Sequence, residues 1–358
     1  MAVTAVVACV SLTGAPSAVA EVQQGVGHLT TPAQPYLNNP DPADWLGSYV
    51  VGGKKVWCVQ FAHLAPDSDE QYQPGAALKT KWGTDLPPNV ASDISYLLLR
   101  YAGTDSADEA AALAHLLHTW TAGPQNAGQL DPANDFRHIA YDAPFHLSKL
   151  PSGAQAAVAA LQADAAVNRG PWTATVAAPD GAQQIGATAD WTITVTNAGG
   201  TGVPDVPVTV TATDATFADA DGKQVSNGTV TTTEDPLTLS VTPTGAAPAI
   251  DITLAGPAVV PVVQQPIEID TQRIVSTGGE KELTAAARTT AAPPPTTTPQ
   301  LPSTIPAGDT PDTPVAQAEV TQRMSGGGWV ALVAVVLAVT LLTVHLARRR
   351  AAGDHQPG

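Results

Sequence analysis

Apolar residues recur with two different periods along the chain, and the period changes near residue 170. Within residues 94–101 and 113–120 they recur every three or four positions, which is typical of helices that bury one face. Within residues 191–196 they alternate with threonine, which is typical of a strand with one buried face. The pattern therefore predicts an α+β N-terminal domain followed by an all-β domain.

The predicted N-terminal domain spans residues 41–170. Residues 48–62 are expected to form two strands, because the β-rich run is interrupted by Gly52-Gly53, a pair that favours a tight turn. The second of these strands carries Cys58.

Capping residues mark the ends of the predicted helices. Ser92 is placed to cap a first helix that stops at Gly103. Ser106, with Glu109 three residues later, matches a capping box that opens a second helix. A third, alanine-rich helix is expected over residues 152–168. The first two helices are joined by a short turn, so we expect them to form a hairpin.

The predicted all-β domain spans residues 171–284. Short strands bounded by Gly, Pro, Asp or Asn indicate an antiparallel β-sandwich. The stretches 191–197 and 206–210 resemble the immunoglobulin-like modules of bacterial surface proteins. Residues 259–263 and 267–274 are two further strand candidates, and they either complete the sandwich or lead out of it.

Both ends of the chain predict an exported, membrane-anchored protein. Residues 1–20 are almost entirely small and apolar and end in Ala-Val-Ala, as in a signal peptide. A lipoprotein signal ending at Cys9 is the alternative, although few residues precede that cysteine. Residues 329–347 form an apolar run long enough to cross a bilayer as one helix.

The charges after the apolar run set the predicted orientation. Arg348, Arg349 and Arg350 follow it directly, and basic residues favour the cytoplasmic side. We therefore expect a cytoplasmic tail over residues 348–358 and an extracellular N-terminal portion. The Thr/Pro-rich residues 285–328 are predicted to form an extended stalk. Within this stalk the sequence Leu-Pro-Ser-Thr-Ile departs from a sortase signal at its last residue.

Charge and cysteine content narrow the classes of partner. The formal net charge is −16, which disfavours nucleic acid as a partner. Removal of the signal peptide leaves Cys58 as the lone cysteine, so the fold has no intramolecular disulfide. An extracellular protein or envelope component is the expected partner, and the sequence calls for no cofactor.

The surroundings of Cys58 resemble a known family. The run Lys54-Lys-Val-Trp-Cys-Val-Gln60 resembles the opening motif of the thioester domains of Gram-positive surface adhesins, including those of actinobacteria. The stretch 108–123 resembles the family's second motif, a helix. The resemblance covers residues 41–170. It implies that a glutamine on this helix condenses with Cys58, and that the resulting thioester acylates amines on another surface.

The expected glutamine is missing from the helix. The position holds Ala114, and the other glutamines considered lie in the wrong places: Gln60, Gln125, Gln129 and Gln155. Because a thioester needs both partners, the sequence favours a relative that keeps the scaffold without the reactive bond. In this interpretation Cys58 is a small apolar side chain in a strand. An active Cys–Gln thioester adhesin is the alternative.

Other polar residues suggest weaker possibilities. His115 and His118 lie one helical turn apart, a spacing that suits a metal, but no third ligand is fixed, although His138 and His146 follow. The clusters 67–70 and 219–222 offer carboxylates to calcium, yet neither continues into a full calcium loop.

An enzyme is the third possibility. The sequence contains no G-x-S-x-G, H-E-x-x-H or P-loop motif. A hydrolase would have to use Cys58 with His115 or His118 as the base and Asp108 to orient it. We therefore expect a surface protein for display, adhesion or envelope interaction, without catalysis.

Overall fold

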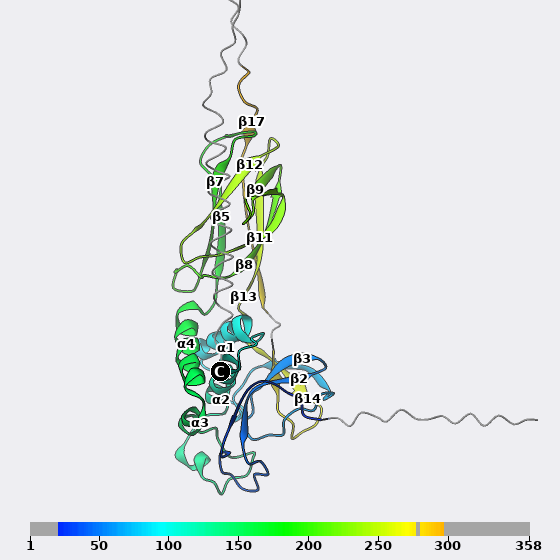
Figure 1. Cartoon of the computed structure of the whole chain (residues 1–358), viewed down its shortest axis with the longest axis vertical. Coiled ribbons are helices and arrows are strands. Elements are labelled where there is room, and N and C mark those ends of the chain that lie inside the picture. Colours follow the sequence, from blue (N-terminus) through cyan, green and yellow to red (C-terminus); the bar gives the residue numbers. More distant parts are fainter. Residues whose placement is uncertain (1–20, 277–279, 297–358) are drawn as a thin grey trace, which may run out of the picture. The chain divides into compact units, whose positions relative to one another are not determined.

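The computed structural model describes residues 21–276 and 280–296, and within them the chain is a mixed α+β structure with several antiparallel sheets (Figure 1). We call residues 21–170 together with 257–276 the helix–sheet part. The remaining described residues form the two-sheet part. The division follows the strand pairing, because the strands of the helix–sheet part share one sheet and those of the two-sheet part form others.

Several predicted segments lie outside the described residues. They are the signal peptide over 1–20, the stalk from 297 onward, the span over 329–347 and the tail over 348–358. None of the helices in the described ranges is both long enough and apolar enough to cross a membrane.

The helix–sheet part contains a six-stranded antiparallel sheet in the order β1-β2-β3-β15-β14-β4. Gly52 and Gly53 join β2 to β3 with φ angles of 55° and 73°, a conformation in which a Cβ atom is strained, so this dipeptide forms the predicted turn. The strands are β1 (Gln24–Thr30), β2 (Asp44–Val51), β3 (Lys54–Cys58), β4 (Tyr72–Ala77), β14 (Val262–Pro266) and β15 (Ile274–Val275).

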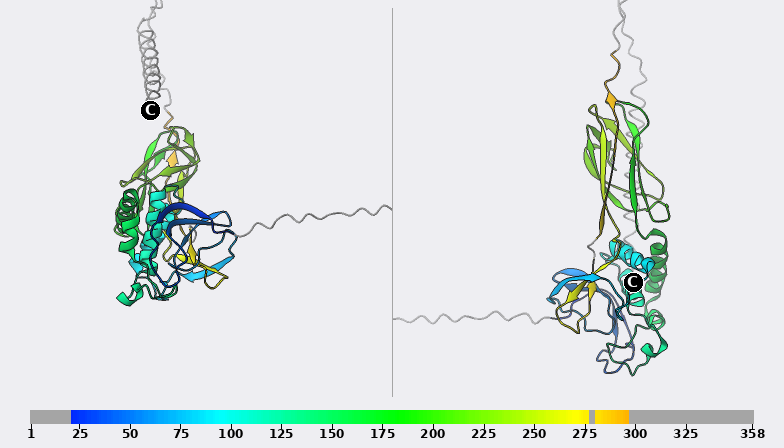
Figure 2. Two further views of the ribbon diagram at one scale, coloured as in Figure 1. Left: turned by 60° about the horizontal axis from the view of Figure 1, so that its bottom comes forward. Right: turned by 180° about the vertical axis from the view of Figure 1, so that it is seen from behind.

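Strands β14 and β15 come late in the chain and return to the first sheet. β15 pairs with β3, and β14 pairs with β4. Figure 2 shows these yellow strands beside the blue and cyan strands of the N-terminal segment. The all-β domain predicted over 171–284 did not anticipate this return, because periodicity shows that a segment is a strand without showing which strand it joins.

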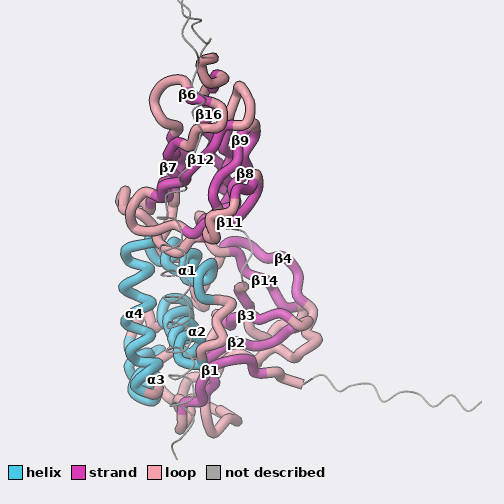
Figure 3. Tube along the Cα trace, turned by 45° about the horizontal axis from the view of Figure 1, so that its top comes forward, coloured by secondary structure: helices cyan, strands magenta, loops and turns pink. Residues whose placement is uncertain are grey.

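Helices cover one side of the sheet (Figure 3). α2 contacts both α1 and α4, and its residues from Ala110 to His118 are all buried. The predicted contact between the first two helices is therefore present, and the third helix also packs on α2. The helices are α1 (Pro88–Tyr101), α2 (Ala107–Ala122), α3 (Ala143–Lys149) and α4 (Ser152–Asn168), with a 3₁₀ helix over Ala127–Leu130.

Of the two predicted N-caps, the one at Ser106 is present, but only half of its predicted capping box forms, because the Ser106 amide donates to the Thr104 hydroxyl and not to Glu109. Ser106 caps α2, since its hydroxyl accepts the amide of Glu109 at 3.3 Å. The Glu109 carboxylate accepts the Thr104 hydroxyl at 2.5 Å. The predicted cap at Ser92 is wrong, because α1 begins earlier and the Ser92 hydroxyl donates to the carbonyl of Pro88 within the helix. Proline at a helix start fixes φ without losing a needed hydrogen bond, which explains the earlier start.

The two-sheet part contains sheets in the orders β10-β9-β12-β7-β5 and β11-β8-β13-β16, with a parallel pair of β6 and β17. Alternate residues such as Trp191, Ile193 and Val210 are buried in a shared core. The strands are β5 (Thr173–Ala177), β6 (Gln183–Gln184), β7 (Ala189–Thr196), β8 (Pro207–Thr213), β9 (Ala215–Ala218), β10 (Gln224–Val225), β11 (Asn227–Thr231), β12 (Leu237–Pro243), β13 (Ala249–Gly256), β16 (Lys281–Arg288) and β17 (Ala291–Ala292).

Two local predictions can be compared with this part. Asp219 and Gly222 form a turn between β9 and β10, in which the Asp219 carboxylate accepts the amides of Asp221 and Lys223. The carboxylate thus stabilises a hairpin turn. The stalk predicted from residue 285 begins too early, because β16 runs to Arg288 and β17 follows. Alanine and threonine suit both a strand and a stalk, which accounts for the error.

Candidate functional site

Cys58 lies on the face of the sheet that points away from the helices. Successive residues of a strand point to opposite faces. Trp57 belongs to the large core that includes α2, whereas Cys58 belongs to a separate small cluster. The other buried members of that cluster are Tyr49, Val56 and Ile274.

The Cys58 thiol is buried, with 4% of the residue exposed. Burial raises the pKa of this thiol above its ordinary value. The thiolate form is therefore disfavoured, and thiol reagents added to the solution should react slowly with Cys58 in the folded protein.

The helix position that resembles the family's glutamine site cannot meet Cys58. Ala114 lies in the large core on the helix side of the sheet, and the Cys58 side chain points to the other side. A glutamine at position 114 would therefore be separated from the sulfur by the sheet itself. The absence of glutamine from α2 does not bear on whether Cys58 can form a thioester.

Strand β15 brings a different glutamine to Cys58. Ile274 is the register partner of Cys58, and Gln272 lies two residues earlier, in the segment that leads into β15. Diagonal neighbours across antiparallel strands have Cβ atoms up to about 7–8 Å apart, within reach of long side chains. Gln272 is 6% exposed. A buried thiol on β3 and a buried amide just before the strand that pairs with β3 therefore belong to adjacent segments.

The Gln272 side chain is held by the loop that follows β3. The main-chain N–H of Gln60 donates to Gln272 Oε1 at 3.3 Å, and Gln272 Nε2 donates to the carbonyl of His63 at 3.1 Å. In return the Arg273 amide donates to Gln60 Oε1 at 2.9 Å. These contacts fix Gln272 and satisfy its amide in the interior.

Tyr72 from β4 connects the two groups. Its hydroxyl donates to the carbonyl of Gln272 at 2.8 Å. The pKa of Tyr72 is raised by burial first, and then by the neighbouring Cys58 and Glu70. The hydroxyl thus lies near Cys58 and against the main chain of Gln272. Strands β3 and β4 and the segment before β15 together build the site.

His115 and His118 lie elsewhere, in a buried cluster on the helix side of the sheet. His115 Nδ1 is 2.8 Å from the Tyr141 hydroxyl, and Tyr141 stacks on His146 with ring centroids 4.2 Å apart. His118 also packs against Tyr141. Over the described ranges, His, Cys, Asp and Glu side chains form no group of three or more that could hold a metal.

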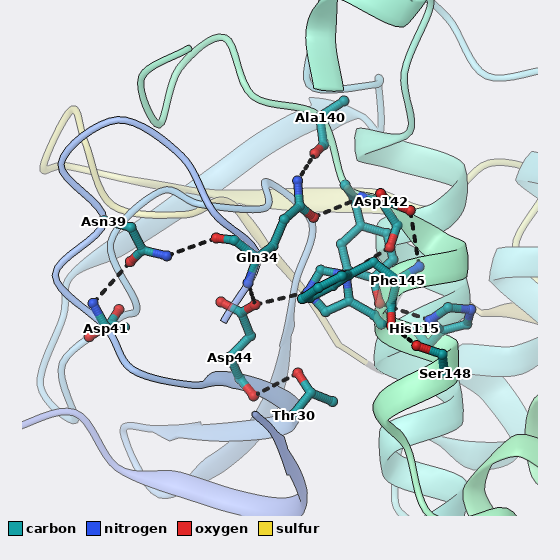
Figure 4. A network of polar contacts seen from close by, with 12 residues as sticks. Thr30, Gln34, Asn39, Asp41, Asp44, His115, Ala140, Asp142, Phe145 and Ser148 are labelled. Atoms are coloured by element: carbon teal, nitrogen blue, oxygen red, sulfur yellow. Dashed lines mark hydrogen bonds and ion pairs between the residues drawn. The ribbon is translucent and has the colours of Figure 1, made fainter. Parts of the chain in front are cut away.

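An ion pair joins this cluster to the first residue of β2. His146 Nε2 is 3.0 Å from Asp44 Oδ2, and the His146 side chain is fully buried. The main-chain N–H of Gln34 donates to the same oxygen at 2.6 Å (Figure 4). His146 Nδ1 faces the carbonyl of Asp142 at 2.9 Å. Both ring nitrogens of His146 therefore lie within hydrogen-bonding distance of an oxygen.

The hydrolase arrangement is not assembled in the described residues. Asp108 contacts His28 Nε2 at 2.7 Å, and it makes no contact with His115 or His118. Both of these histidines lie with the large core, on the opposite side of the sheet from Cys58. Cys58 therefore has neither histidine as a base.

The buried histidines predict acid sensitivity. Burial lowers the pKa of His115 to about 4 and of His118 to about 3, with His146 as a further cause. The unfolded chain, with ordinary values near 6.5, binds protons first. Stability should therefore be complete above pH 6.5 and fall as the pH is lowered towards 4.

Urea unfolding between pH 7 and pH 5 measures this effect. The variant His118→Leu should flatten the decline by up to about 1.4 kcal/mol per pH unit, which is one proton's contribution. The exposed Val167, which does not titrate, serves as the control, and Val167→Ala should leave the slope unchanged. Equal slopes for the wild type and His118→Leu would contradict the assignment.

The prediction from sequence missed Gln272 and Tyr72. The signal for Gln272 in the sequence was its place within the strand candidate 267–274, but nothing in the sequence pairs that strand with β3. No protein-family model matches the chain, and no curated protein matches it either.

Proposed function

We propose that this protein is a membrane-anchored cell-surface protein that acts in display, adhesion or envelope interaction. The apolar segments 1–20 and 329–347, with arginines after the second, support export and a single span with the C-terminus in the cytoplasm. The helix–sheet part is the proposed thioester-like domain of a Gram-positive actinobacterial protein. The two-sheet part is the proposed immunoglobulin-like spacer, and the expected partner is extracellular.

Protease treatment of intact cells tests the orientation. Added protease should remove the part before residue 329 and leave a small membrane-protected fragment, because the basic tail is retained inside. A cytoplasmic protein of the same cells should stay intact as the control. Recovery of the full-length chain, while another surface protein is digested, would reverse the orientation.

The mode of adhesion that the geometry supports best is covalent, through Cys58 and Gln272. The observation that carries it is the burial of both groups, with the amide two residues before the register partner of Cys58 and with Tyr72 near both. Burial protects a thioester from water, so the site suits a reactive bond that must persist until a partner arrives. A non-covalent adhesin with an inert Cys58 is the second candidate, favoured by the raised thiol pKa.

Formation of the bond balances without a cofactor or oxidant. The Cys58 sulfur attacks Gln272 Cδ, the C–N bond breaks, and the thiol proton leaves with the amide nitrogen as ammonia. The main-chain N–H of Gln60 already donates to Gln272 Oε1, the carbonyl oxygen on which negative charge develops. An incoming amine then attacks the same carbon, and Cys58 leaves as a thiol. The protein is consumed once per bond, so this is binding and not enzymatic turnover.

Methylamine tests the covalent mode. The wild-type protein should take up one methylamine, located at Gln272 by peptide mapping, and Cys58 should become reactive towards thiol reagents afterwards. The variants Cys58→Ser and Gln272→Asn should take up none, whereas Gln125→Asn, at an exposed glutamine, should behave as the wild type. Unmodified Gln272 in a folded wild-type protein would contradict the covalent mode and favour the non-covalent one.

A further inference from the structure

The loops next to Gln272 expose large apolar side chains. Leu64, Ile267 and Ile269 are 62%, 67% and 88% exposed. They belong to two segments that lie side by side. The main-chain N–H of Leu64 donates to the carbonyl of Asp270, and the main-chain N–H of Gln272 donates to the carbonyl of Leu64. An exposed apolar set beside a buried polar site is typical of a surface that binds a partner.

Carboxylates are interleaved with these apolar residues. Glu268 lies between the two isoleucines in the sequence, and Glu70 accepts the hydroxyl of Thr271, next to Gln272, at 3.4 Å. The pKa of Glu70 is raised by burial first, and then by Glu268 and, more weakly, by Asp67. Glu268 and Asp67 therefore each lie close enough to Glu70 to repel its carboxylate. We call Asp67, Glu70 and Glu268, with Leu64, Ile267 and Ile269, the acidic–apolar rim.

The rim carboxylates lack a cationic partner within the described part of the chain. The nearby Arg137 is already paired with Asp270 at 2.6 Å. The other ion pairs of the described residues involve none of Asp67, Glu70 and Glu268. Mutual repulsion without a counter-charge is a cost that a bound cation would remove. Glu70 also acts on Tyr72, whose hydroxyl contacts Gln272, so the negative potential extends to the site.

We propose that the acidic–apolar rim selects the partner, and that this partner is a protein segment with a lysine flanked by apolar residues. The inference rests on the covalent mode proposed above and names the acyl acceptor of that site. The apolar flanks cover Leu64 and the two isoleucines, and the lysine ammonium is drawn in by the carboxylates.

The transfer step balances within this arrangement. The ammonium loses one proton to a rim carboxylate or to water, and its nitrogen attacks Gln272 Cδ. The C–S bond breaks, the second proton passes to the Cys58 sulfur, and an amide joins the lysine to Gln272. No other reactant is needed.

Two dye-labelled peptides with one lysine each test the rim on the full-length protein in detergent. One peptide flanks the lysine with valine and leucine, and the other flanks it with serine and glutamate. The first should label the protein roughly tenfold faster at low salt, with a preference that falls as salt is added, because charge steering is screened. The double variant Glu70→Gln/Glu268→Gln should lose most of this preference. The control Asp180→Asn/Glu234→Gln, with the same change of charge in the exposed two-sheet part, should keep it.

A parallel measurement separates failure of the rim from failure of the thioester. In Cys58→Ser no covalent bond can form, and reversible binding of the same peptides is followed by fluorescence anisotropy. The apolar lysine peptide should bind more tightly, and the Glu70→Gln/Glu268→Gln change should weaken it. Equal binding of both peptides here, with or without the two glutamates, overturns the rim. Selective binding in Cys58→Ser without any labelling of the wild type supports the rim and rejects the thioester.

Discussion

Replacing Asp44 by alanine is expected to destabilise the protein by about 3–5 kcal/mol, the range for removing one partner of a buried ion pair. The change leaves the fully buried His146 ring without its carboxylate partner. It also leaves the main-chain N–H of Gln34 without its acceptor. Both groups then lie unsatisfied between the loop before β2 and helix α3. Urea unfolding at pH 7 measures the loss.

Asp85→Ala is the matched control for Asp44→Ala. Asp85 also forms an ion pair, with Lys79 at 3.1 Å, but its side chain is 86% exposed. Exposed ion pairs contribute little, so this control should change the stability by less than about 0.5 kcal/mol. A loss of similar size for both variants would mean that the pair at Asp44 is not buried as described.

Leu117→Ala should cost about 2–5 kcal/mol, the range for deleting most of a buried leucine side chain. Leu117 is fully buried in α2, the helix that contacts α1, α4 and the sheet, so the cavity left behind cannot collapse easily. Val167→Ala on the exposed side of α4 is the control, expected to fall within about 0.5 kcal/mol. A loss at Leu117 no larger than the control would place α2 outside the core.

Local sequence patterns predicted much of the secondary structure. The helix over 152–168 begins and ends at the predicted residues, and the glycine pair 52–53 forms the predicted turn. Strand β7 follows the alternation seen at 191–196. In each case the signal is the side-chain pattern of a single element, and burial of that pattern against any neighbour gives the same result.

The site depended on information that the local pattern does not contain. β15 reaches β3 only after the chain has passed through most of the two-sheet part, and no residue near Cys58 indicates this pairing. The local pattern therefore points to the α2 position that holds Ala114 and not to Gln272. The histidines of α2 show the same limit, because one helical turn places them on a common side without showing that Tyr141 and His146 bury them.

The intact mass of the purified full-length protein tests the covalent site most directly. Closure of a Cys58–Gln272 thioester expels one ammonia, so the wild type should be lighter by ~17 Da than its processed sequence, and methylamine should abolish the deficit. Cys58→Ser and Gln272→Asn should show no deficit, and Ala114→Gln should keep that of the wild type. A folded wild-type protein with the full mass of its sequence, unchanged by methylamine, would contradict the thioester.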